Sequence, residues 1–135
     1  MEITRIPFPT HTNDTGSLSF FEGERHIPFA IRRVYYIYDV AEGARRGFHA
    51  HKNLKQVLFC IHGSCDLLLD DGSEKTVVTL SKASEGILLE GVIWREMFNF
   101  SPGAVLIVMA SEYYDEADYI RNYEAFMKYI EGEKE

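Results

Sequence analysis

Short strand-forming segments separated by turn residues are the feature of this sequence that most restricts its fold. β-Branched and aromatic residues dominate these segments, and Gly, Pro, Asp and Ser cluster between them. Strands this short at this spacing are typical of an antiparallel sandwich or barrel. The predicted strands are residues 34–40, 55–63, 64–71, 75–81, 85–91, 95–101 and 104–111.

The ends of these segments and the C-terminal tail complete the predicted architecture. Residues 70–73, Asp-Asp-Gly-Ser, predict a hairpin turn because Asp and Gly tolerate positive φ. In the tail, apolar residues recur at steps of three and four, which predicts a helix packed on the sandwich or on a second subunit. The residues on that helical face are Ile120, Tyr123, Met127 and Ile130. The sequence therefore predicts an all-β fold with one C-terminal helix.

Length and charge limit the classes of function. With 135 residues, of which 46% are hydrophobic, the chain is predicted to form a single domain, residues 1–135, with a substantial core. No apolar run is long enough to span a bilayer, and the first residues lack the pattern of a secretion signal, so we expect a cytoplasmic protein without a membrane partner. A net charge of −7 argues against a nucleic-acid partner.

One motif specifies the kind of β-fold. Gly43, His49, His51, Gln56 and Gly63 follow the spacing G-x5-H-x-H-x4-E-x6-G of the first cupin motif, with glutamine in place of glutamate. Residues two apart on a strand point to the same face, so the two histidines are expected to project together. The predicted fold class is a cupin-type antiparallel β-sandwich or barrel, the double-stranded β-helix or jelly roll, with a C-terminal α-helix.

The same motif argues against a bound metal. Gln56 replaces the carboxylate ligand, and counting two residues on from Gly91 places Trp94 where a third histidine would return. An indole nitrogen has no lone pair for a metal, and a neutral amide is a poor ligand. Two imidazoles alone would hold a divalent ion weakly. We therefore predict neither a metal nor another cofactor.

The neighbours of the histidine pair suggest proton chemistry. Imidazole titrates near neutrality and can take and return a proton, and either Tyr35 or the second histidine could stabilise the oxygen of an enediolate formed next to a carbonyl. Basic residues in the first half of the chain have two readings. They are either solvated surface or the lining of a site for an anion such as a phosphate ester.

Four long strings resemble one family of enzymes: IPFAIRRVYYIYDV, RRGFHAHKNLKQVLFCIHGSC, VIWREMFNFS and MASEYYDEADYIRNYEAF. They are similar to the TDP-4-keto-6-deoxyglucose 3,4-ketoisomerases, the WxcM-like sugar isomerases. This resemblance implies a metal-free cupin that forms a homodimer with exchanged N-terminal strands. It also implies a TDP-linked 4-keto-6-deoxy sugar as substrate. The ketone would move from C4 to C3, on the route to 3-amino-3,6-dideoxy sugars of surface glycans such as O-antigens and S-layer glycans.

The resemblance also implies roles for individual residues. His49 matches the catalytic base, His51 its partner, and Tyr35 a tyrosine near the reacting sugar. Arg95 and Thr15 lie at positions that vary in the family and could steer protonation of C4, and Arg95 favours a gluco over a galacto product. Tyr119 has a second reading as an interface or core residue. The substrate-binding residues implied are Thr15, Arg33, Arg46, Lys52, Trp94, Arg95, Tyr119 and Arg121.

Three other functions remain as alternatives. A nucleotide-sugar 3,5-epimerase would exchange protons at C3 and C5, whereas a ketoisomerase would label C4 of its product and leave C5 alone. A metal-dependent cupin oxygenase would carry a metal after purification without chelators. A non-catalytic sugar-nucleotide-binding cupin would bind the nucleotide sugar without turnover.

Overall fold

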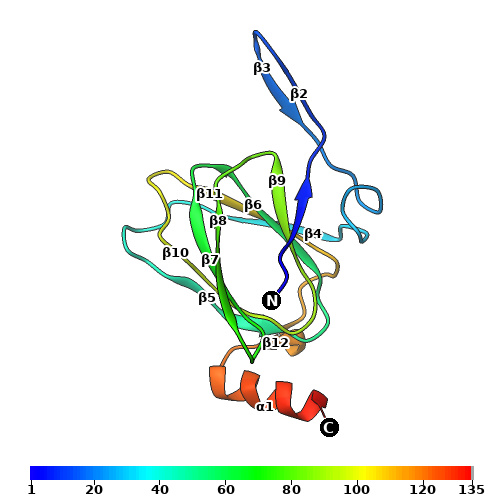
Figure 1. The fold of residues 1–135 in the computed structure, drawn as a ribbon, viewed down its shortest axis with the longest axis vertical. Helices are drawn as coiled ribbons and strands as arrows, with labels where there is room; N and C mark the ends of the chain where they lie inside the picture. Colours follow the sequence, from blue (N-terminus) through cyan, green and yellow to red (C-terminus); the bar gives the residue numbers. More distant parts are fainter. Residues whose placement is uncertain (135) are drawn as a thin grey trace.

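Two five-stranded antiparallel sheets pack face to face in the computed structural model, which describes residues 1–134 (Figure 1). The first sheet has the order β1 (Thr4–Pro7), β9 (Glu85–Leu89), β6 (Gln56–His62), β11 (Val105–Ala110), β4 (Arg33–Ile37). The second has the order β12 (Tyr119–Ile120), β5 (Arg46–His51), β10 (Trp94–Phe98), β7 (Cys65–Asp70), β8 (Lys75–Leu80). The predicted all-β class is confirmed.

The seven predicted strands all form, each within one to three residues of the expected ends. β5 lies outside these seven segments and was indicated only by the spacing of the two histidines, and four short strands were not predicted at all: β1, β2 (Thr10–Asn13), β3 (Gly16–Ser19) and β12. They have only two to four residues, and most of their side chains are exposed, so they carry no alternation of apolar and polar residues. The β7–β8 hairpin turn forms as predicted, with the Asp70 carboxylate accepting the Gly72 N–H at 2.8 Å.

Apolar side chains fill the space between the sheets. Alternation along the strands points one set inward, so that Leu58 of β6 lies in this core while its neighbours Val57 and Phe59 lie on the outer face of the first sheet. Burying each such aliphatic side chain stabilises the fold by about 1.5–3 kcal/mol. The inner core contains Leu58, Leu67, Leu69, Ile87, Met97, Leu106 and Val108.

The outer faces of the sheets are covered by the two ends of the chain. Phe8, Ile27 and Phe29 from the N-terminal region pack on the outer face of the first sheet. The helix α1 (Tyr123–Lys134) packs on the second, where Phe126 is fully buried against Trp94 at a ring-centroid distance of 5.8 Å. Of the two predicted positions for the helix, the one on the sandwich is therefore confirmed.

The predicted helical face was wrong at one residue. Ile120 lies in β12, paired with Ala50 of β5, and not in the helix. The helix begins at Tyr123 because the Asn122 side chain accepts the Ala125 N–H at 3.0 Å, as an N-terminal cap does. Ile120 still packs against Phe126, so its hydrophobic spacing reflects the shared cluster and not a shared helix.

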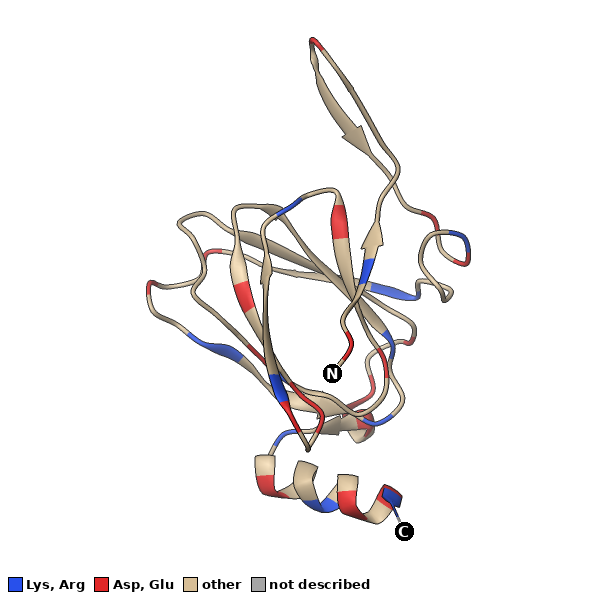
Figure 2. Ribbon diagram, in the orientation of Figure 1, with Lys and Arg blue, Asp and Glu red and all other residues tan. Residues whose placement is uncertain are grey.

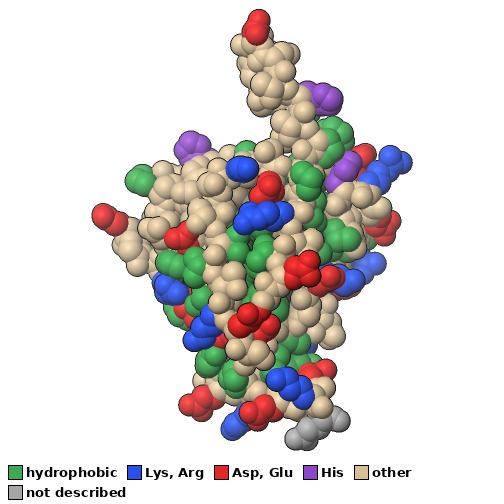
Figure 3. All heavy atoms as spheres, viewed as in Figure 1, with side chains coloured by type: hydrophobic (Ala, Val, Ile, Leu, Met, Phe, Trp, Pro, Cys, Tyr) green, Lys and Arg blue, Asp and Glu red, His purple; other side chains and the backbone are tan. Residues whose placement is uncertain are grey.

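The β2–β3 hairpin projects from the body of the molecule (Figure 1). Every residue of both strands is exposed, and its surface is mainly uncharged and polar (Figure 3). Acidic and basic residues are interspersed over the strands and α1, so the net charge is not concentrated in one element (Figure 2). Within residues 1–134, no helix has the length and apolar content to cross a membrane.

Candidate active site

A cavity of about 490 Å³ lies where β4, β5 and the segment before α1 meet. This volume is within the range of small-molecule sites. Six of the predicted site residues line it, although they are spread over nearly ninety residues of sequence. They are Arg33, Tyr35, Arg46, His49, Tyr119 and Arg121.

A β-bulge in β5 orients His49. Arg95 pairs with His49 and Glu96 pairs with Gly47, so that Phe48 is an extra residue, and its φ is 53°. The Nδ1 atom of His49 lies 3.0 Å from the Gly47 carbonyl oxygen. Since a carbonyl only accepts, Nδ1 carries the hydrogen and Nε2 keeps a free lone pair. Nε2 is buried and has no hydrogen-bond partner within the described residues.

His51 has the same arrangement through a different partner. Its Nδ1 donates to the Asp118 carboxylate at 3.0 Å, and that carboxylate also accepts the Asn53 N–H at 2.8 Å. The His51 side chain is fully buried, and within residues 1–134 its Nε2 also has no partner. The two imidazole centroids are 4.9 Å apart. The site therefore holds two adjacent imidazoles, each with an unoccupied lone pair.

Burial and a nearby cation keep both imidazoles neutral. Burial, followed by the positive charge of Arg95, lowers the pKa of His49 to about 4. The same two causes lower the pKa of His51 to about 2. At neutral pH both imidazoles are therefore uncharged, and each can act as a base by accepting a proton at Nε2.

Arg95 lies beneath the cavity. It is 2% exposed, and burial lowers its pKa to about 10, so it remains a cation at neutral pH. Its guanidinium donates to the Gln56 side-chain oxygen and to the Ile93 carbonyl. Gln56 in turn donates to the Tyr35 hydroxyl oxygen at 3.1 Å. A buried positive charge thus lies beside the two bases and the tyrosine.

These residues do not fit the metal that the cupin fold commonly carries. The Gln56 oxygen accepts from Arg95 and its nitrogen donates to Tyr35, so the amide has no free ligand atom for a metal. A divalent cation needs anionic ligands, whereas here the positive charge of Arg95 would repel it. Within residues 1–134, no three His, Cys, Asp or Glu side chains gather as metal ligands would. The donor set is suited to proton transfer.

Trp94 is a correction to the predicted site. Motif counting placed it at the third-ligand position, facing the cavity, but alternation along β10 turns Arg95 inward and Trp94 outward. Its ring packs against Tyr123 at 5.4 Å, and its indole N–H donates to Glu96 at 2.9 Å. We therefore assign Trp94 to the packing of α1 on the second sheet.

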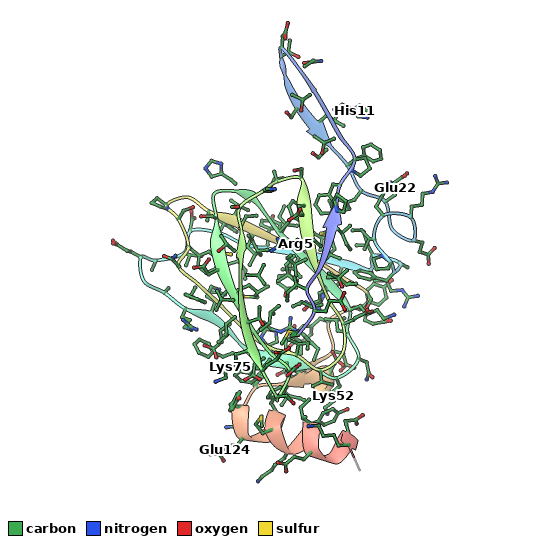
Figure 4. The ribbon with its side chains drawn as sticks, viewed as in Figure 1. Arg5, His11, Glu22, Lys52, Lys75 and Glu124 are labelled. Atoms are coloured by element: carbon green, nitrogen blue, oxygen red, sulfur yellow. The ribbon has the colours of Figure 1, made fainter. Side chains whose placement is uncertain are left out.

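Two other predicted binding residues do not reach the cavity. Lys52 follows β5 and points toward α1, with its Nζ 5.7 Å from the centre of the Tyr129 ring (Figure 4). Thr15 lies in the turn between β2 and β3, at the tip of the projecting hairpin (Figure 1). Neither residue lines the cavity of its own chain.

The arginines at the cavity are held by aromatic rings and a carboxylate. The Arg121 guanidinium lies 4.2 Å from the Tyr119 ring centre and donates to Glu116 at 2.5 Å and 2.9 Å. The Arg33 guanidinium lies near the rings of Tyr35 and Tyr114, at 5.5 Å and 5.7 Å. Cations fixed in this way at a cavity suit an anionic ligand.

Three residues near the cavity were missed by the sequence reasoning: Tyr114, Glu116 and Asp118. Asp118 orients His51 from 67 positions away, a contact that no local spacing encodes. All three lie in the string MASEYYDEADYIRNYEAF, which carries the family resemblance but implied no role for these three residues. Its density of tyrosines and carboxylates was the one available signal.

Stability is expected to fall as the pH falls below about 6.5. Unfolding lets both imidazoles take up protons that the fold denies them, so the unfolded state binds more protons from pH 6.5 down to about 4 for His49 and about 2 for His51. Each contributes a loss of up to about 1.4 kcal/mol per pH unit. Urea unfolding at pH 7, 6 and 5 measures the slope.

The matched variants for this slope are His51→Asn and His11→Asn. The first removes a buried histidine and is expected to make the slope shallower by up to about 1.4 kcal/mol per pH unit. The second changes a histidine that lies exposed on the hairpin, away from the buried pair. Equal slopes for all three proteins would contradict this account of the buried imidazoles.

The two facing antiparallel sheets, with His49 of the His-x-His pair at the cavity, define a cupin-type protein. The model of the family described as FdtA, WxcM-like, C-terminal, matches residues 1–131. The chain therefore belongs to the FdtA family of WxcM-like sugar 3,4-ketoisomerases. The predicted family, fold and class of enzyme, a nucleotide-sugar 3,4-ketoisomerase, are confirmed.

Characterised relatives are similar over nearly the whole chain. A TDP-4-oxo-6-deoxy-α-D-glucose-3,4-oxoisomerase from Aneurinibacillus thermoaerophilus is 48% identical over 130 residues, which are 96% of this chain and 94% of the relative. A variant of the 3,4-ketoisomerase QdtA from Thermoanaerobacterium thermosaccharolyticum, solved with TDP-4-keto-6-deoxyglucose, is 42% identical with a TM-score of 0.94, covering 96% and 94% of the two chains. A 3,4-ketoisomerase from Helicobacter canadensis is 41% identical with a TM-score of 0.93, covering 97% and 98%.

Proposed function

We propose that this enzyme converts TDP-4-keto-6-deoxy-D-glucose to a TDP-3-keto-6-deoxyhexose by proton transfer from C3 to C4. The observation that carries the proposal is the Nε2 atom of His49, a free and buried lone pair on a neutral imidazole at the cavity. The QdtA variant bound to this sugar nucleotide supports the choice of substrate.

The proposed reaction begins at C3. The C3–H bond breaks, its proton goes to Nε2 of His49, and its electron pair forms a C3=C4 double bond while the carbonyl electrons move to O4. Tyr35 donates to this oxygen, and the buried charge of Arg95 stabilises the enediolate. The proton of the O3 hydroxyl passes to O4, and the proton held by His49 is delivered to C4, directly or by way of His51. The product is an isomer, so no electrons leave the sugar.

We assign the pyrophosphate of the substrate to the arginines of the cavity. Arg33, Arg46 and Arg121 all line it, and the aromatic rings around Arg33 and Arg121 restrict where their charges lie. Guanidinium groups chelate phosphate oxygens in pairs. The pyrophosphate of the substrate would replace the Glu116 carboxylate as the partner of Arg121, because either anion can accept from the same guanidinium donors.

We infer a gluco configuration at C4 of the product from Arg95. Hydrogen bonds to Gln56 and Ile93 fix its guanidinium beneath the wall of the cavity that carries Tyr35. A cation fixed on that wall favours one orientation of the enediolate oxygen, and hence one face of C4 for protonation. The choice of the gluco face comes from the family resemblance, in which arginine at this position implies the gluco product.

Proton NMR of the reaction tests the proposed function. The purified protein is incubated with TDP-4-keto-6-deoxyglucose in D₂O, and deuterium is expected at C4 of a 3-ketone product with none at C5. The coupling constant between H4 and H5, read from product formed in H₂O, reports the gluco or galacto configuration. Deuterium at C3 and C5 would indicate the epimerase, and tight binding without turnover would indicate a binding protein. Either result would contradict the proposal.

We also propose a homodimer in which the β2–β3 hairpins are exchanged. The hairpin touches little of its own body, and an isolated two-stranded hairpin is marginally stable at best. Leu18 and Phe20 are 59% and 40% exposed on it, which leaves apolar surface for a partner to cover. Exchange would bring Thr15 toward the cavity of the partner.

Sedimentation of variants tests the exchanged hairpin. The unchanged protein is expected to sediment as a dimer, and Leu18→Asp is expected to weaken dimerisation by at least about tenfold, because a charge would replace an apolar side chain that the partner covers in the proposed dimer. Ser17→Asp, at an exposed neighbouring position that faces the other way along the strand, is the matched control. A monomeric protein, or equal dimerisation of both variants, would contradict the exchange.

The position of the enzyme in a reaction sequence follows from its proposed product. A ketone at C3 of a nucleotide-linked sugar is the substrate that a transaminase needs to install a 3-amino group. We therefore propose that the product leads to 3-amino-3,6-dideoxy sugars of surface glycans. The cytoplasmic location stays a prediction from the sequence.

A further inference from the structure

We propose that Gln56 is a positioning residue that directs the hydroxyl proton of Tyr35 into the cavity. This inference rests on the proposed function, because it assumes that Tyr35 donates to a sugar oxygen. It also explains why an amide, and not the carboxylate of the cupin motif, stands at position 56. The direction of each hydrogen bond in this cluster is set by which groups can donate and which can only accept.

The guanidinium of Arg95 determines the orientation of the Gln56 amide. A guanidinium group has only donors, so the amide atom that it contacts must be the oxygen. The amide nitrogen then necessarily points to Tyr35, whose hydroxyl oxygen lies 3.1 Å away. Gln56 is fully buried, and an amide turned by 180° would place its NH₂ group against the donors of Arg95, so only the observed orientation satisfies both neighbours.

The orientation of the amide determines the role of the Tyr35 hydroxyl. An amide nitrogen has hydrogens and no free lone pair, so the Tyr35 oxygen is the acceptor in this contact. The hydroxyl hydrogen must therefore point elsewhere, and within residues 1–134 the hydroxyl makes no other hydrogen bond. Tyr35 lines the cavity, so the cavity is where that hydrogen finds an acceptor.

A carboxylate at position 56 would reverse this direction. It would still accept from Arg95, but with its second oxygen it would also accept from Tyr35 and so capture the hydroxyl proton. Burial raises the pKa of Tyr35, which keeps the hydroxyl protonated and available as a donor. The chain of hydrogen bonds from Arg95 through Gln56 to Tyr35 thus ends on a donor only because position 56 is an amide.

A double-mutant cycle between positions 56 and 35 tests the inference. Gln56→Glu is nearly equal in size and keeps the contact with Arg95, and it is expected to lower kcat by about a hundredfold, as removal of an oxyanion donor does. Tyr35→Phe is expected to have a similar effect. The double variant is expected to stay within about twofold of Tyr35→Phe alone, because the effect of position 56 passes through the hydroxyl.

The controls separate this inference from the proposed function and from misfolding. Turnover by the unchanged protein tests the function by itself, and calorimetry with TDP, which lacks the sugar, is expected to give the same affinity for all four proteins. If Gln56→Glu does not fold, Gln56→Met replaces it in the cycle with an expected loss of about tenfold. Additive losses, or an unchanged kcat in the variant at position 56, would overturn the inference.

Discussion

Replacing His49 by asparagine is expected to lower kcat by at least about a hundredfold, within the range of 10²–10⁴ for a positioned base. The free Nε2 lone pair at the cavity is the proposed acceptor of the C3 proton, and an amide cannot accept it. Asparagine can still donate to the Gly47 carbonyl, so the contact that orients His49 is preserved in kind. Steady-state kinetics with the nucleotide sugar measure the loss.

Two controls show whether the loss of activity is chemical. The affinity for TDP is expected to stay unchanged in His49→Asn, because the proposed pyrophosphate ligands are arginines and not the imidazole. The unfolding midpoint in urea at pH 7 is expected to stay close to that of the unchanged protein. A variant that fails to fold would instead assign His49 to the structural residues of β5.

Replacing Arg95 by methionine is expected to lower kcat by about 10²–10³, comparable to the loss of an oxyanion-stabilising donor. The change removes the buried positive charge that faces both histidines and Tyr35. It also leaves the oxygen of Gln56 without its donor, so the amide is free to turn. The same change is expected to raise the pKa of His49, because the charge of Arg95 is one cause of its low value. Kinetics from pH 5 to pH 8 measure both effects.

Trp94→Phe is the matched control for Arg95. The two residues are neighbours on β10, but Trp94 points to α1 and Arg95 to the cavity. Trp94→Phe is expected to lower the free energy of unfolding by about 1–3 kcal/mol and to leave kcat within about twofold. If Arg95→Met and Trp94→Phe both fold and lose kcat equally, the placement of these two side chains would be contradicted.

Most of the sandwich could be predicted because its strands carry a local signal. Segments such as residues 104–111 are continuously apolar and bounded by turn residues, and they became β-strands at nearly the expected positions. β2 and β3 lack such a signal, because no apolar side chain of the hairpin is buried in the body. Ile120 followed the helical period by coincidence, since β12 and α1 contribute to one hydrophobic cluster.

The site could be predicted only where neighbouring residues on one strand define it. The His-x-His pair follows from the period of a strand, and both imidazoles lie side by side. Asp118 and Tyr114 come from a distant segment, and only the tertiary fold brings them to the pair. Trp94 was misplaced because counting from a glycine gives a position in sequence and does not fix which face of β10 that position occupies.

The central claim is that His49 removes the proton at C3 and that a proton then reaches C4 through the imidazoles. The most direct measurement is turnover of TDP-4-keto-6-deoxyglucose that carries deuterium at C3, with NMR used to locate the label. We predict slower turnover than with the unlabelled sugar, because the C3–D bond must break. At C4 of the product we expect either the transferred deuterium or a proton taken up from solvent. Equal turnover of the labelled and the unlabelled sugar, or the same kinetics for the protein and its His49→Asn variant, would contradict it.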